Sequence, residues 1–120
     1  MINDLSVLKT ASAMATHAAR RHAVISKNIA NADTPNFKAK DVKPFADIYQ
    51  DAARTGTQLE HAVDATKLIT MDGTADPNGN TVSLEQQMLS SSGAVGDHDL
   101  ALLIYRKTLD MMKLAIGKNI

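Results

Sequence analysis

The residue pattern closest to a metal site spans residues 76–80, Asp-Pro-Asn-Gly-Asn, where side-chain oxygens recur at alternate positions. A calcium-binding EF-hand loop begins in this way, but it also requires Gly at its sixth position and Glu at its twelfth. Thr81 and Gln87 occupy those two positions, and no helical pattern leads directly into the loop. The sequence therefore predicts a turn ahead of a helix at residues 76–80, and no metal ligands.

The histidines offer a second possible site. Asp97 and Asp99 flank His98, but adjacent residues on a helix point about 100° apart and cannot converge on one ion. Acidic side chains near the positive end of a helix dipole explain the pair more simply. His22 lies on an apolar stripe, where a packed histidine is expected, and His17 is too far round the helix to join it.

Motifs that carry catalysis are missing as well. The chain has no glycine-rich phosphate loop, no G-x-S-x-G and no H-E-x-x-H. With no Cys, it can form neither a disulfide nor a thiolate zinc site. We therefore predict no catalytic, metal-binding or cofactor-binding residues, no cofactor, and a protein that is not an enzyme.

The composition narrows the class of protein further. The 120 residues include 13 Lys plus Arg and 13 Asp plus Glu, so the formal net charge is zero. A nucleic-acid partner or an anionic membrane surface would call for a basic patch, so we expect neither. Eighteen residues are Ala and only four are aromatic, which suits close helix packing better than a thick core. No apolar run approaches the roughly 20 residues of a membrane span, and the first residues do not resemble a cleaved secretory signal.

The first of three segments, residues 1–32, is predicted to form a long helix. It has no Gly or Pro, and it ends in Asn and Asp residues followed by Pro35. A stripe with alternating steps of three and four residues runs along it. Its members are Leu8, Ala11, Ala15, Ala18, His22, Ile25 and Ile29.

The third segment, residues 83–120, is predicted to be helical too. Ser83 and Gln86 form a capping-box pattern at its start. Gly93 and Gly96 lie inside it, so the sequence allows either one long helix with a weak point or two helices with a joint. The apolar stripe beyond them comprises Leu102, Tyr105, Leu109, Met112 and Ile116.

The middle segment, residues 33–82, holds all three Pro and is the least determined. Pro44 could occupy the first position of a short helix. Residues 58–71 look extended, and a β-hairpin within them is weakly indicated. The predicted fold is therefore mainly α, with long N- and C-terminal helices paired as an antiparallel coiled coil and an extended, irregular middle segment that has room for a β-hairpin.

Residues 26–37 concentrate amide and hydroxyl side chains around Ile29 and Phe37. A helix end followed by a turn explains Asn31, Asp33 and Pro35. It does not explain so many short polar groups together, which can satisfy backbone atoms where a chain leaves a helix inside a packed assembly.

Residues 28–39, Asn-Ile-Ala-Asn-Ala-Asp-Thr-Pro-Asn-Phe-Lys-Ala, resemble the N-terminal signature of the flagellar rod and hook axial proteins. Residues 79–88, Gly-Asn-Thr-Val-Ser-Leu-Glu-Gln-Gln-Met, together with Asp41 and Val42, resemble the proximal rod members of the basal-body rod protein family. Asn36 replaces the Gly of the signature, which Asn tolerates because it enters the left-handed region readily. Phe37 replaces its Tyr and keeps the ring.

The resemblance implies a structural subunit of the proximal rod that polymerises through coiled-coil packing and is part of the drive shaft. It implies export without cleavage by the flagellar type III apparatus and a place in the rod, in the periplasm. The implied partners are further copies, other rod subunits, and the membrane-supramembrane ring with its rod adaptor protein. Another axial rod subunit, or a soluble helical-hairpin export chaperone or adaptor, remains an alternative.

Two sets of residues are expected to carry this role. The first lies at the elbow after the N-terminal helix and comprises Asn28, Ile29, Asn31, Thr34, Pro35 and Phe37. The second forms the seam between the helices and comprises Leu8, Ala15, Ala18, Ile25, Leu102, Tyr105, Leu109, Met112 and Ile116.

Overall fold

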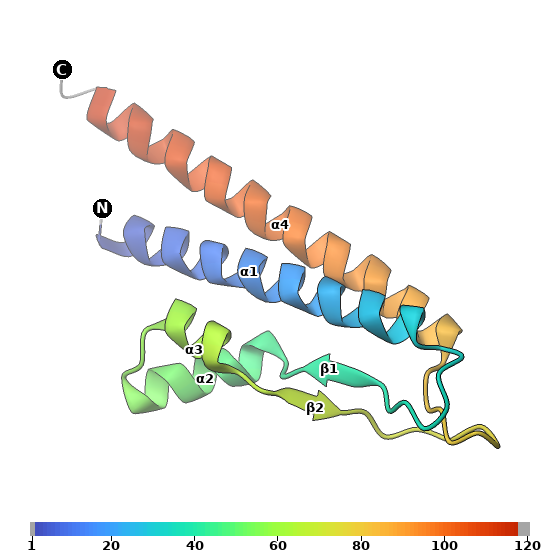
Figure 1. The fold of residues 1–120 in the computed structure, drawn as a ribbon. Helices are drawn as coiled ribbons and strands as arrows, with labels where there is room; N and C mark the ends of the chain where they lie inside the picture. Colours follow the sequence, from blue (N-terminus) through green and yellow to red (C-terminus); the bar gives the residue numbers. More distant parts are fainter. Residues whose placement is uncertain (1, 118–120) are drawn as a thin grey trace.

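The computed structural model describes residues 2–117 and is dominated by two long helices (Figure 1). Helix α1 spans Ile2–Ala30 and helix α4 spans Leu84–Gly117. Between them lie four short elements: β1 (Lys40–Val42), α2 (Phe45–Thr55), α3 (Leu59–Ala65) and β2 (Leu68–Thr70). The mainly α fold and the pairing of the two long helices are as the sequence predicts.

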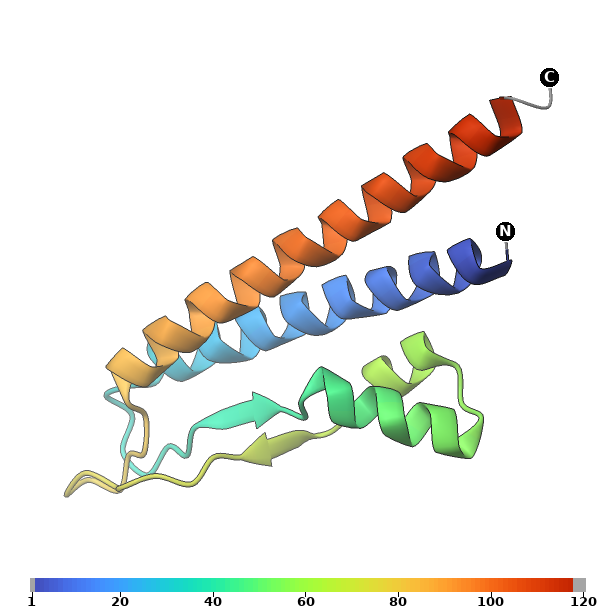
Figure 2. The same ribbon diagram turned by 180° about the vertical axis from the view of Figure 1, so that it is seen from behind.

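Helices α1 and α4 run antiparallel (Figures 1 and 2). They pack along a line of mostly small side chains. On α4 the buried residues recur at every seventh position, which is the repeat of a helix seam. They are Gln87, Ala94, Ala101 and Thr108. On α1 the buried residues Ala11, Ala18 and Ile25 follow the same repeat. Alanines at these positions allow the two backbones to approach closely.

The middle segment covers the other side of α1, which therefore lies between α4 and this layer (Figure 2). Ala13 of α1, Ile48 of α2 and Val63 of α3 form a small buried core. Arg20 of α1 donates a hydrogen bond of 2.9 Å to the carbonyl of Val63, which ties α3 to α1. Helix α1 is thus the element on which both layers are built.

The predicted hairpin within residues 58–71 is wrong. Leu59–Ala65 is helical, because Leu59, Ala62 and Val63 fall on one side of a helix turn and pack into the small core. The two strands are instead far apart in the sequence: β1 pairs antiparallel with β2, with Asp41 opposite Ile69. Pro44 starts α2 nearly as predicted, at the N-cap and not at the first helical position.

Helix α4 continues through Gly93 and Gly96 without interruption. A methyl group added at either glycine would meet nothing within 4 Å, so neither glycine serves a close approach of another element. Of the two arrangements that the sequence allowed, the structure has the single long helix.

Candidate functional site

The two sequence motifs lie against each other where the chain leaves α1 and where it enters α4. We call this region, residues 28–39 together with residues 78–88, the elbow (Figure 1). Its polar side chains come from both motifs, and they satisfy backbone groups that the turns leave free. The elbow therefore fixes how the two long helices begin their contact.

Asn28 joins three segments at the end of α1. Its side-chain nitrogen donates to the carbonyl of Lys40 at 2.7 Å and to the side-chain oxygen of Gln87 at 3.0 Å. Its side-chain oxygen accepts from the backbone N–H of Lys40 at 3.1 Å. Both Asn28 and Gln87 are 1% exposed. Because buried amides are costly without partners, this network holds α1, β1 and α4 in one arrangement.

Asn80 has the same function on the other motif. Its side-chain nitrogen donates to the carbonyls of Asn31 and Thr34, each at 2.8 Å, and its oxygen accepts from the N–H of Val82. The side chain is 1% exposed. One buried amide thus caps the turn after α1 and shapes the approach to α4.

A close crossing of two turns completes the elbow. Asn36 has a φ of 62° and donates its N–H to the carbonyl of Asn78 at 2.9 Å. Gly79 has a φ of 86°, and a Cβ there would lie 2.3 Å from the side-chain oxygen of Asn36. Position 79 strongly favours glycine, because the backbone angle strains any other residue and a Cβ there would displace the Asn36 side chain.

A short ladder continues from this crossing toward the strands. The N–H of Thr81 donates to the carbonyl of Phe37 at 3.0 Å, and the N–H of Ala39 donates to the Thr81 hydroxyl at 2.9 Å. Lys38 reaches the carbonyl of Gly79 at 2.6 Å. The two motifs are therefore paired along their length and not only at one residue.

The structure places the predicted elbow residues in different environments. Asn28 is buried, Asn31 and Phe37 are half-buried, and Ile29, Thr34 and Pro35 are exposed. The Thr34 hydroxyl donates to the Asn31 side chain at 3.0 Å within the turn. The prediction omitted Asn80, Thr81 and Gln87, although the second motif contains all three, because their partners lie some 40 to 60 residues away in the sequence.

The predicted seam residues also differ in how deeply the structure buries them. On α1, Leu8, Ala18 and Ile25 are buried and Ala15 is half-buried. On α4, Tyr105, Leu109 and Met112 are half-buried, whereas Leu102 and Ile116 are exposed, contrary to expectation. Helix α4 turns its alanines and Thr108 toward α1, because small side chains allow the closer contact. The larger residues one position further along therefore lie beside the seam.

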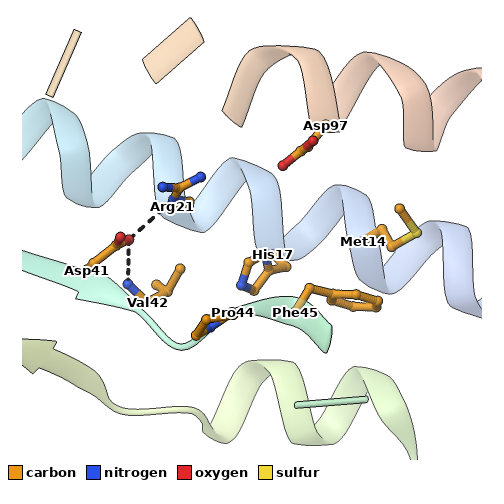
Figure 3. A pocket seen from close by; sticks show the side chains of 8 residues that line it. All are labelled: Met14, His17, Arg21, Asp41, Val42, Pro44, Phe45 and Asp97. Atoms are coloured by element: carbon orange, nitrogen blue, oxygen red, sulfur yellow. Dashed lines mark hydrogen bonds and ion pairs between the residues drawn. The ribbon is translucent and has the colours of Figure 1, made fainter. Parts of the chain in front are cut away.

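A cleft of about 330 Å³ opens on one side of α1, between α4 and the middle layer (Figure 3). Arg21 pairs with Asp41 at 3.3 Å, and the Nε2 atom of His17 lies 2.7 Å from the carbonyl of Lys43. The His17 ring also packs edge-on against Phe45, with centroids 5.6 Å apart. These contacts attach the start of the middle layer to α1. Within residues 2–117, no three potential ligands are grouped to hold a metal ion.

Comparison with known proteins agrees with the geometry of the elbow. The family model described as flagella basal body rod protein matches residues 8–38, which include most of α1 and the first elbow motif. The chain is 26% identical to the flagellar basal body rod protein FlgB of Agrobacterium fabrum over 130 residues, covering 98% of this chain and 97% of that protein. Over nearly its whole length the chain is therefore similar to a flagellar basal body rod protein. These matches support a structural role in the rod of the flagellar basal body, and so in motility.

Two further observations accompany these matches. The match to the FlgB relative extends over nearly the full length of both chains. Over the described residues, no helix is both long enough and apolar enough to cross a membrane.

Proposed function

We propose that this chain is a proximal rod subunit that polymerises through packing of its long helices and so contributes to the drive shaft. The observation that carries the proposal is the docking of the two motifs at the elbow through Asn28, Asn80 and Gln87. This arrangement fixes the α1–α4 pair as a building unit. The end-to-end similarity to a FlgB protein supports the proximal position in particular.

The proposal includes a route and a set of neighbours. The chain is exported by the flagellar type III apparatus without cleavage and assembles in the periplasmic part of the basal body. Its neighbours are further copies, other rod subunits, and the membrane-supramembrane ring with its rod adaptor protein. Large apolar side chains that remain exposed on α4 supply surface for such contacts, among them Leu100, Met111 and Leu114.

Complementation tests the proposal. We expect the chain to restore rods and swimming in the source bacterium after deletion of its gene, with basal bodies examined by electron microscopy. Asn28→Ala and Asn80→Ala should fail, because each removes a buried amide of the elbow. Lys27→Ala, an exposed change on the same helix turn, is the matched control and should succeed.

The alternatives give different outcomes in the same strain. If basal bodies lacking this chain still contain complete rods, a soluble chaperone or adaptor role replaces the proposal. If the missing piece is a more distal part of the rod, the chain is another axial subunit. Loss of the rod at its base is the expected result.

A further inference from the structure

Helix α4 carries a second seam that the single chain does not bury. Met88 is 65% exposed and Leu102 is 39% exposed, and they belong to a set of apolar residues at every seventh position. The set comprises Met88, Val95, Leu102, Leu109 and Ile116. The first four of these residues each follow a buried seam residue of α4 by one position, and Ile116 continues the repeat. The stripe therefore lies about 100° round the helix from the side that faces α1. Over 28 residues the stripe is about 42 Å long.

The space beside this stripe suits a helix. A hollow of about 250 Å³ lies between α1 and α4, lined on the α1 side by Ala18, Ala19 and His22 and on the α4 side by Ala94, Val95 and His98. The side chains on the α1 side are thus two alanines and one histidine, and the lining of the hollow as a whole is mostly apolar. In this repeat Leu109 is half-buried and the other four residues are exposed. A seven-residue repeat of such apolar residues next to a hollow is typical of a coiled-coil contact with a further helix.

The spacing of the stripe is symmetric about Leu102, although the residue types on its two sides differ. Val95 and Leu109 lie seven residues to either side of it, and Met88 and Ile116 lie fourteen to either side. The charged residues on the outer rim are not symmetric. Asp99 precedes the centre, whereas Arg106 and Lys113 follow it at the same seven-residue spacing.

We propose that the stripe binds the α4 helix of a second copy of this chain, antiparallel, about a two-fold axis at Leu102. In this arrangement Val95 packs on the partner's Leu109, and Asp99 lies beside the partner's Arg106. A parallel arrangement in register would instead place Asp99 beside the partner's Ala94 and His98, on the opposite rim from the partner's Arg106, so the pairing of opposite charges would be lost. The rim charges therefore favour the antiparallel dimer.

The contact is isologous, since each copy uses the same surface, and it closes on itself. It buries the stripe without extending into a filament, so it differs from any contact that builds a rod. The proposal goes beyond the structural role in the rod and does not depend on it. It can be tested on the purified full-length chain.

Sedimentation equilibrium over a range of concentrations tests whether the dimer forms. We expect the wild-type chain to dimerise, and Leu102→Asp to weaken dimerisation by ~tenfold or more, since central apolar residues dominate such interfaces. Leu103→Asp is the matched control, because Leu103 is 46% exposed but points a further 100° away from the stripe. Circular dichroism establishes that both variants remain helical. A wild-type chain that stays monomeric at all concentrations, or equal effects of the two variants, would overturn the proposal.

Cysteine cross-linking tests the orientation, and it is clean because the natural chain has no Cys. Leu102→Cys alone should form a disulfide-linked dimer under mild oxidation. Val95→Cys mixed with Leu109→Cys should cross-link far more than either variant alone. If Val95→Cys links to itself as readily as in the mixture, the helices are parallel and the proposal is wrong. Exchange of charges adds a check: Asp99→Arg and Arg106→Asp should each weaken the dimer, and the double variant should restore it.

Discussion

The two ends of the α1–α4 pair differ in the kind of side chain that lies there, polar and buried at one end and apolar and exposed at the other. At the elbow the helices are held by buried amides with complete hydrogen bonding, whereas toward the termini they diverge (Figures 1 and 2). There Met111 and Leu114 are 61% and 67% exposed. The directional polar contacts are satisfied within one chain, whereas apolar surface stays exposed at the open end. The closed end fixes the shape of the helix pair, and the open end is available for the contacts proposed above.

The largest effect on this contrast is expected from Asn28→Ala. The change leaves the N–H and C=O of Lys40 and the side-chain oxygen of Gln87 without their partner, which costs about 3 kcal/mol of unfolding free energy. Urea unfolding followed by circular dichroism measures the loss. Lys27→Ala, the exposed neighbour, should change stability by less than about 0.5 kcal/mol. Equal stability of the two variants would show that the elbow is not held by its amides.

Ala101→Leu and Leu114→Ala compare the closed and open parts of the pair directly. Ala101 is fully buried in the α1–α4 seam, so a larger side chain there should cost about 2 kcal/mol through overpacking. Leu114→Ala at the open end should change the stability of the single chain by less than about 0.5 kcal/mol. Thermal unfolding of the two variants measures both values. A large loss for Leu114→Ala would mean that the open end is closed in solution.

Gly79→Ala tests the crossing of the two turns. A methyl group would lie 2.3 Å from the Asn36 side chain, on a backbone with a φ of 86°, so we expect a loss of about 2 kcal/mol. Adding Asn36→Gly should recover the part due to the clash but not the part due to the backbone angle. Chemical unfolding of the single and double variants separates the two. Full recovery would assign the whole cost to the clash.

Gly93→Ala and Gly96→Ala should have the opposite sign. Both glycines lie within α4 with open space around them, so alanine should add about 0.5 to 1 kcal/mol of stability at each. A rise in the thermal midpoint measures the gain, and Gly79→Ala serves as the contrasting glycine. A loss at either position would indicate that the helix needs its weak point.

The smallest effect is expected at Asp51, in the middle layer away from both ends. A hydrogen bond from Lys43 lowers the pKa of its carboxyl below the ordinary value of 3.8, and Arg54 lowers it further. A lowered pKa stabilises the fold above the unfolded value, and this contribution is lost as the pH falls through the folded pKa. The stability difference between wild type and Asp51→Asn should therefore be present at neutral pH and vanish in acid. A difference that persists at low pH would assign the effect to something other than ionisation.

The two long helices of this architecture can be predicted from the sequence. The alanine-rich stripe before Pro35 and the capping box at Ser83 predict the two long helices, because helix periodicity and end signals are local. The first elbow motif includes Asn28, and it too can be recognised from a short stretch of sequence. The pairing of β1 with β2 escapes such an analysis, since each strand has only three residues and its partner lies 25 residues or more away.

The sequence by itself determined the helices, the elbow motifs and the resemblance to the flagellar rod proteins, because each of these rests on short-range pattern. Only the tertiary structure decided which face of α4 meets α1. Periodicity predicts an apolar stripe of large side chains, but close packing against α1 favours the line of Ala94, Ala101 and Thr108 beside it. The structure alone also showed that Asn80 and Gln87 complete the elbow, since a buried amide can be recognised as satisfied only when its distant partners are in place.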